Sequence, residues 1–300
     1  MIKEYEEDYE FENASGFEKS YRQLSDSVSH PAARPIAIAF QRNIERVVQL
    51  NTFPLEVIHW SSVIVRAYEK LLTPNDFDKL TTAEGNEVAW ISACAVLKQL
   101  LQVRAGTKKR TSRIEYQEHL SGGLESILYA MLSASYAAFE AAATDCWIEL
   151  MNSDVDAVGR WIKDNRDKSI TLAELAGESF NLSKGMGTYL HRSQKVSFLS
   201  LRDIKKAYDL AYPVETTSYF GPESGLREAE SVRHLLAHRS GVIDAKFKQA
   251  MVAVPAYEDQ QIGSFIRVTG PMVNRNVYAS VKAGMVLIKF ADQHLTALAS

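Results

Sequence analysis

The sequence predicts an all-α protein. Apolar residues recur at intervals of three and four positions through most of the chain, and this spacing places them on one face of a helix. Prolines, glycines and hydroxyl-bearing residues stand between these segments, as they do where helices begin and end. Only SFIRVTG, residues 264–270, has the character of a short β-strand. The evidence for a sheet is therefore small.

Length and composition place the chain among ordinary globular proteins. Its 300 residues allow one large domain or two smaller ones, and 46% of them are hydrophobic and 24% charged. The net charge of -3 gives no global attraction to nucleic acid or to an anionic membrane, so such affinity would need a local patch. Cys94 and Cys146 are too few for a four-thiolate zinc site, and we expect both to be buried and reduced.

The sequence also bears on location. It begins MIKEYEEDYEFE, which lacks the basic start and apolar run of a signal peptide. No window holds the roughly 18 consecutive apolar residues that a membrane span needs. We therefore expect a cytoplasmic protein with no membrane partner.

The N-terminal part divides into two segments. Residues 1–30 form an acidic polar arm, either solvated or folded over a basic site elsewhere. Residues 31–105 form a helical region with no chemical motif. Its helices are predicted from AIAFQRNIERVVQL, PLEVIHWSSVIVRAYEKLL and NEVAWISACAVLKQLLQVR.

Residues 106–123 have the composition of a basic linker. Lys108, Lys109, Arg110 and Arg113 precede the first acidic residue of this stretch. Such a linker is commonly only solvated, and it is also the best local candidate for contacting RNA phosphates.

A second helical region, residues 124–298, follows Gly122-Gly123. It opens with a long helix of many small residues, LESILYAMLSASYAAFEAAATDCWIELM, and closes with NVYASVKAGMVLIKFADQHLTAL. Helix starts are predicted by the capping spacings Thr171-Leu-Ala-Glu174 and Ser200-Leu-Arg-Asp203. Gly185 and Gly187 predict a turn between shorter helices.

The stretch REAESVRHLLAHRSGVIDAKF, residues 227–247, carries the candidate chemistry. On a helical wheel one side is polar and the other apolar. The polar side holds Glu230, Arg233, His234 and His238, with the small Ala237 among them. Gly241 ends the helix, so His238 lies in the last turn, where the helix dipole favours a protonated imidazole.

These groups suit the cleavage of RNA. A histidine can take the proton of the 2′-hydroxyl or give one to the leaving 5′-oxygen near neutral pH. A guanidinium can stabilise the negative charge that gathers on the phosphate oxygens. This chemistry requires no metal and no cofactor, and we expect neither.

Arg233-His234-Leu-Leu-Ala-His238 resembles the signature of the HEPN superfamily, which is an arginine, a polar residue, three variable residues and a histidine. HRSGVIDAKF (238–247) resembles the continuation of that signature. FEAAATDCWIEL (139–150) and VSFLSLRDIKKAYDLAY (196–212) resemble two other helices of the family. The resemblance covers roughly residues 120–298 and is weak outside the signature helix.

The resemblance implies an antiparallel helical bundle that forms a homodimer with one composite site. It also implies metal-independent endoribonuclease activity of the kind found in toxin–antitoxin, abortive-infection and antiviral systems, with an antitoxin or defence protein as a further partner. Arg233 and His238 are then catalytic, His234 fills the supporting polar position, and Glu140 lies near the site. Glu230, on the same face of the signature helix, would also support it.

Two alternatives remain open. Many HEPN proteins have lost activity, so the chain could be a module that binds nucleotide, RNA or a partner protein through the same patch. It could also be a scaffold whose N-terminal region is the interaction surface. Asp244 either caps the next helix or pairs with a histidine.

Overall fold

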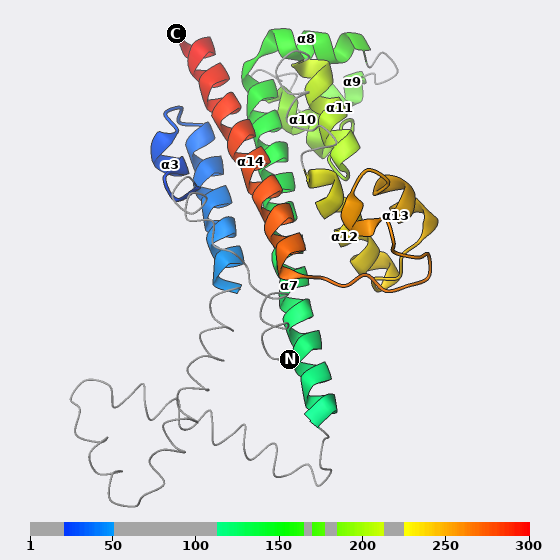
Figure 1. Cartoon of the computed structure of the whole chain (residues 1–300). Helices are drawn as coiled ribbons and strands as arrows, with labels where there is room; N and C mark the ends of the chain where they lie inside the picture. Colours follow the sequence, from blue (N-terminus) through cyan, green and yellow to red (C-terminus); the bar gives the residue numbers. More distant parts are fainter. Residues whose placement is uncertain (1–20, 51–112, 165–169, 178–184, 213–224) are drawn as a thin grey trace, which may run out of the picture. The chain divides into compact units, whose positions relative to one another are not determined.

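The computed structural model describes residues 21–50, 113–164, 170–177, 185–212 and 225–300, with the side chains of residues 113–124, 164, 172 and 175 outside the description (Figure 1). The chain divides into two compact units. One unit contains residues 1–48 and 125–300, and the other contains residues 49–124. Residues 51–112 of the second unit lie outside the described residues, and so do two of the predicted N-terminal helices.

The described residues confirm the all-α prediction. They form helices joined by short loops and contain no β-strand. The predicted strand at residues 264–270 is wrong. It is reduced to a single antiparallel bridge between Val242 and Phe265, and helix α14 already begins at Gly270. Backbone hydrogen bonds join residues 263–266 to residues 241–243, but the paired stretch is too short to form strands.

Helix α7 spans Arg113–Ser153 and is longer than predicted. It contains the whole segment 124–151, which confirms that helix, but it also continues upstream through Gly122-Gly123. Residues 113–123, which the predicted linker includes, are therefore helical. Each glycine costs a helix only about 1 kcal/mol relative to alanine, and the rest of a long helix can absorb that cost.

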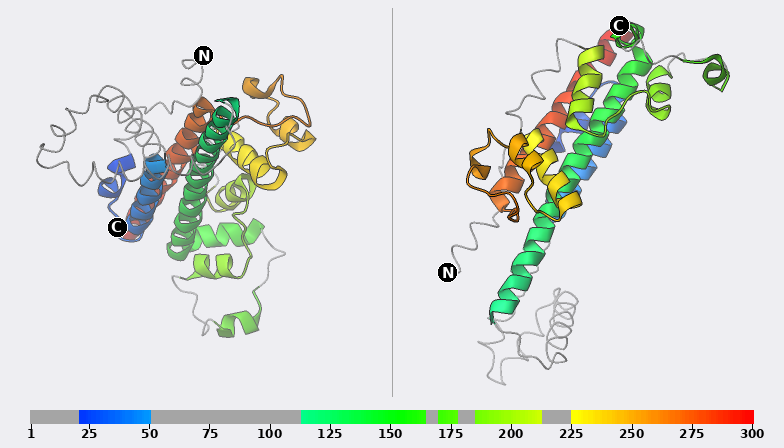
Figure 2. Two further views of the ribbon diagram at one scale, coloured as in Figure 1. Left: turned by 90° about the horizontal axis from the view of Figure 1, so that it is seen from below. Right: turned by 90° about the vertical axis from the view of Figure 1, so that its right-hand side faces the viewer.

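A bundle of long helices surrounds α14, which spans Gly270–Ala299. Residues 33–50 are helical and run antiparallel to it, because His30 lies at Asp292 and Phe40 lies at Gly284. Helix α12, Leu226–Arg239, is also antiparallel to α14, whereas α7 runs in the same direction as α14 (Figure 1). The helix of residues 33–50 and α12 lie on opposite sides of the α7–α14 pair (Figures 1 and 2).

The first described residues pack with the C-terminal bundle. Tyr21, Leu24 of helix α3 (Leu24–Ser27) and Val28 are buried, so this part of the predicted acidic arm is docked rather than solvated. Asp292 accepts hydrogen bonds from the backbone N–H groups of Ser29 and His30, at 2.9 and 2.6 Å. The start of the predicted N-terminal helical region thus belongs to the same unit as the C-terminal bundle.

Short helices follow α7 along the chain. They are α8 (Val155–Asp164), α9 (Leu172–Gly177), α10 (Met186–Arg192) and α11 (Leu201–Ala211). The capping predictions are confirmed, because Glu174 N–H donates to Thr171 Oγ1 and Asp203 N–H donates to Ser200 Oγ.

The predicted turn at Gly185 and Gly187 is only half right. Gly185 precedes α10, but Gly187 is inside it, where a Cβ would overlap the Ile148 carbonyl of α7.

The core is aromatic as well as aliphatic. Trp147 of α7 is fully buried, packs edge-on against Trp161, and donates from its indole nitrogen to the Ala207 carbonyl of α11 at 3.1 Å. Cys146 beside it is buried, and burial raises the pKa of its thiol. None of the described helices combines the length and apolar composition that crossing a bilayer requires.

Candidate functional site

Helix α12 presents the signature residues on its solvent-facing side. Val232 and Leu235 are buried against the core, whereas His234, Ala237 and His238 are exposed. The helix starts after Gly225, whose φ of 73° favours glycine, and a Cβ there would meet Ala279 of α14. The burial of α12 thus agrees with the apolar side and the polar side that the helical wheel predicts.

The end of α12 explains why serine and glycine follow the histidine. Ser240 and Gly241 have φ of 52° and 82°, so two successive residues adopt the left-handed conformation. The backbone N–H groups of Ser240 and Gly241 both donate to the Leu235 carbonyl, the second at 3.2 Å, and these bonds close the last turn. The closure fixes the turn that carries His238.

Arg233 is held by α7. Its Nη1 lies 2.6 Å from Oε2 of Glu140, and its guanidinium carbon lies 4.9 Å from the centre of the Tyr136 ring. The Arg233 side chain remains 30% exposed, so the guanidinium is oriented by the protein and still reaches solvent. Glu140 is thus in direct contact with Arg233.

Burial shapes the electrostatics of this contact. It raises the pKa of Glu140, the hydrogen bond and charge of Arg233 oppose that rise, and the nearby Glu230 carboxylate adds to it. Burial also raises the pKa of Tyr136, helped by the charges of Glu230 and Glu140. Because the Glu230 carboxylate is close enough to act on Glu140, loss of Arg233 would leave Glu140 partly buried and near a like charge without its cationic partner.

Tyr136 was not foreseen from the sequence. It lies four positions before Glu140 on α7, which puts both side chains on the same face of one helix. That spacing is the only sequence signal that could have indicated it.

Glu230 has a structural task. Its Oε1 accepts a hydrogen bond from the Leu201 backbone N–H at 2.8 Å, at the first turn of α11. Carboxylates are stabilising at this end of a helix, because the first N–H groups have no partner within the helix. Glu230 therefore links the signature helix to the start of α11, next to the Ser200 cap.

His234 and His238 form a pair on the exposed side of α12. Their ring centres lie 4.6 Å apart and the ring planes are tilted by 52°. Desolvation lowers the pKa of His234, and so do the charges of His238 and Lys246, while Asp244 and Glu230 oppose the change.

The polar side of α12 thus has two clusters. Among the described residues, no hydrogen bond, ion pair or ring contact joins Arg233 to His238. One cluster is Arg233 with Glu140 and Tyr136, and the other is the histidine pair.

The predicted RNA-binding basic residues receive no structural description. Lys108, Lys109 and Arg110 lie outside the described residues, and Arg113 is described only as the first residue of α7.

Two roles were proposed for Asp244, and the structure shows the capping role. Its Oδ1 accepts a hydrogen bond from the Phe247 N–H at 2.8 Å, at the start of helix α13, Ala245–Ala250.

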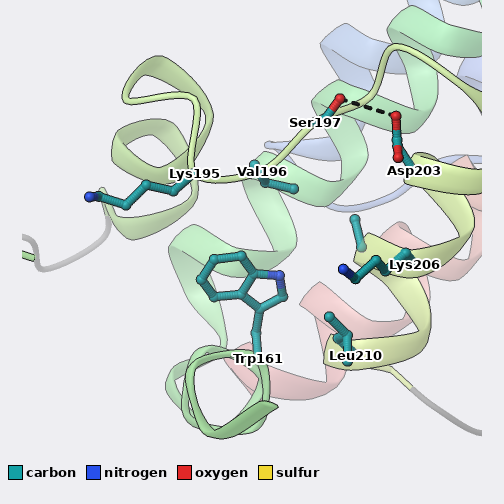
Figure 3. Close-up of a pocket in the computed structure, with 8 residues that line it drawn as sticks. Trp161, Lys195, Val196, Ser197, Asp203, Lys206 and Leu210 are labelled. Carbon is teal, nitrogen blue, oxygen red and sulfur yellow. Dashed lines mark hydrogen bonds between the residues drawn. The ribbon is translucent and has the colours of Figure 1, made fainter. Parts of the chain in front are cut away.

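A small pocket is lined by residues outside the signature helix (Figure 3). It has a volume of about 130 Å³ and contains the hydrogen bond from Ser197 Oγ to Asp203 Oδ2. The residues that line it come from α8, α11 and the loop before α11, and are Trp161, Lys195, Val196, Ser197, Asp203, Lys206, Ala207 and Leu210. None of them belongs to the predicted site.

Within the described part of the chain, no cluster of three or more histidine, cysteine, aspartate or glutamate side chains could hold a metal ion. No protein-family model, curated protein or solved structure matches the chain.

Proposed function

We propose that the protein is a metal-independent endoribonuclease of the HEPN type. The observation that carries the proposal is the polar side of α12, where the partly exposed Arg233 is oriented by Glu140 and Tyr136, and His238 is exposed in the closed last turn. An oriented guanidinium and an accessible imidazole are the groups that phosphodiester transesterification needs.

In the proposed reaction the 2′-oxygen of the RNA attacks the adjacent phosphorus and the bond to the 5′-oxygen breaks. The products are a 2′,3′-cyclic phosphate and a 5′-hydroxyl. One imidazole takes the proton of the 2′-hydroxyl, or gives a proton to the 5′-oxygen. Arg233 stabilises the phosphate oxygens through the nitrogens that Glu140 leaves unused.

Within one chain, Arg233 contacts Glu140 and Tyr136, whereas His238 contacts His234. This arrangement supports a composite site. In the proposed homodimer, α12 of a second copy supplies the complementary group. Mixing Arg233→Ala and His238→Ala proteins, each strongly impaired alone, should then restore part of the activity after subunit exchange. Light scattering should give twice the mass of the chain, and a strictly monomeric active enzyme would exclude the composite site.

The central test is the cleavage of RNA by the full-length protein with and without EDTA. We expect cleavage in both cases and a 2′,3′-cyclic phosphate end. His238→Ala should slow cleavage by about 10²- to 10⁴-fold, the usual worth of general acid–base help.

The matched control is His191→Ala, which removes an exposed histidine from α10, away from the signature helix. It should cleave at the wild-type rate. Absence of cleavage by the wild type, alone or in the presence of a cellular trigger, would refute the enzymatic proposal.

The second candidate function is binding without catalysis, and the Arg233–Glu140 pair is the observation that favours it. An arginine that is already paired with a carboxylate can still bind an anionic ligand, but it stabilises the additional negative charge of a transition state less well. RNA or nucleotide binding that weakens in Arg233→Ala, with no product formed, would select this candidate.

A further inference from the structure

The histidine pair has a geometry that its proposed role in catalysis does not require. His234 and His238 are one helical turn apart, both are exposed, and their rings approach to 4.6 Å between centres. Side chains at this spacing lie above one another on a helix, so both imidazoles face the same volume of solvent. General acid–base catalysis by His238 would need only one of them.

Two imidazoles one turn apart can share a metal ion. The same spacing supplies two zinc ligands in the helical H-E-x-x-H motif of metalloproteases. Imidazole nitrogen is a preferred ligand for zinc, copper and nickel, and water can complete the coordination. The neighbouring Ala237 is small and exposed, so it leaves the approach to the pair open.

The surrounding charges are compatible with a bound cation. Arg233 is drawn toward α7 by Glu140, and Arg239 makes an ion pair with Asp244 at 3.6 Å. The two guanidinium groups nearest in the sequence are therefore engaged with carboxylates. Lys246 is the exposed cation that acts on His234, and it opposes the binding of a metal ion.

We propose that His234 and His238 form a two-histidine site for a divalent transition metal ion such as Zn²⁺. The ion has no part in the proposed cleavage reaction. Because it occupies the imidazole of His238, it inhibits that reaction. The binding itself does not depend on the proposed function, whereas the inhibition rests on it.

Binding is tested by titrating the full-length protein with Zn²⁺ in a calorimeter. Wild type should bind with an affinity at least about tenfold higher than either His234→Ala or His238→Ala, a difference of about 1.4 kcal/mol. His191→Ala, which removes another exposed histidine, should bind as wild type does. Circular dichroism verifies that each variant is folded.

Both substituted side chains are exposed, so loss of the fold is not expected to obscure the result. Equal affinity of the wild type and both α12 variants would overturn the proposal, whether or not the protein cleaves RNA. A loss of affinity in His191→Ala of the same size as in the α12 variants would also overturn it.

Inhibition separates this inference from the proposed function. If the protein cleaves RNA, Zn²⁺ at saturating concentration should stop cleavage and EDTA should restore it. Cleavage that continues with the site filled would overturn the inhibitory role and leave the nuclease standing. Specific binding by a protein that never cleaves RNA would support the metal site and refute the nuclease.

Discussion

At the scale of single residues, the Arg233–Glu140 pair shows how a functional group and a structural contact coincide. Arg233 bridges α12 and α7, and its guanidinium lies over the Tyr136 ring. The contact orients the side chain before any ligand arrives, which reduces the entropy lost on binding. The same contact opposes the rise in the pKa of Glu140 that burial causes.

The pair should be measurable as a coupling energy. We expect Glu140→Gln and Arg233→Gln each to lower the free energy of unfolding by about 1 to 2 kcal/mol, because each leaves a partly buried charged partner without its hydrogen bond. In the double variant the losses should not add, and the coupling should be about 1 kcal/mol. Urea unfolding of the four proteins gives this value, and additive losses would mean that the pair contributes nothing to stability.

The residues of the candidate site could be identified from the sequence, but the contacts that they make could not. The wheel of α12 correctly separated Val232 and Leu235 from the exposed histidines, since periodicity reports which side of a helix is buried. It could not show that Arg233 would bind a carboxylate 93 positions away. Nor could it show that Glu230 would cap α11, because both contacts depend on how separate helices pack.

At the scale of elements, helix ends were the most predictable feature. The caps at Thr171, Ser200 and Asp244 are formed by side chains three residues from the N–H groups that they accept from, so their signal is local. The start of α7 was missed because here the local signal was misleading. Gly122-Gly123 resembles a local break, but it lies inside a helix.

Asp154 joins three elements at the end of α7. Its Oδ1 accepts from the Ala157 N–H at 2.9 Å and so caps α8, while its Oδ2 lies 2.8 Å from Nε2 of His294 on α14 and 3.6 Å from Arg160. Burial opposes ionisation of this carboxyl. The hydrogen bonds from Ala157 and His294, with the charges of His294 and Arg160, outweigh burial and hold its pKa below the ordinary value.

This lowered pKa predicts a dependence of stability on acid. The stabilisation is present above the unfolded-state pKa of about 3.9 and is lost as the pH falls through the lower folded-state value. Asp154→Asn should therefore reduce the free energy of unfolding by about 2 kcal/mol at pH 7 and make it less sensitive to pH below 4.

The matched control is Asp156→Asn, an exposed position in the first turn of the same helix. Chemical unfolding between pH 2 and pH 7 measures all three proteins. An equal acid response in wild type and Asp154→Asn would show that the carboxylate does not carry this effect.

At the scale of the whole molecule, the all-α class was predictable, but the grouping of its parts was not. Composition and periodicity gave no sign that residues 21–48 pack with the C-terminal bundle. Two contacts are responsible. Asp292 accepts hydrogen bonds from the N–H groups of Ser29 and His30, and Phe40 packs against Gly284. Each joins positions more than 200 residues apart, and no local pattern encodes such a meeting.

Gly284 tests this grouping directly. A Cβ at this position would overlap the Phe40 ring, so the helix of residues 33–50 can approach α14 this closely only because the residue is glycine. Gly284→Ala should lower the free energy of unfolding by about 1 to 3 kcal/mol through overpacking. Phe40→Leu should recover part of that loss in the Gly284→Ala background.

Gly159→Ala supplies the control, because Gly159 lies inside α8 with no atom within 4 Å of an added Cβ. There the same change should raise stability by about 0.4 to 1 kcal/mol by restricting the unfolded chain. The two alanine variants should therefore move the urea midpoint in opposite directions. If Gly284→Ala stabilised the protein as Gly159→Ala does, the helix of residues 33–50 would not lie against α14 at this position.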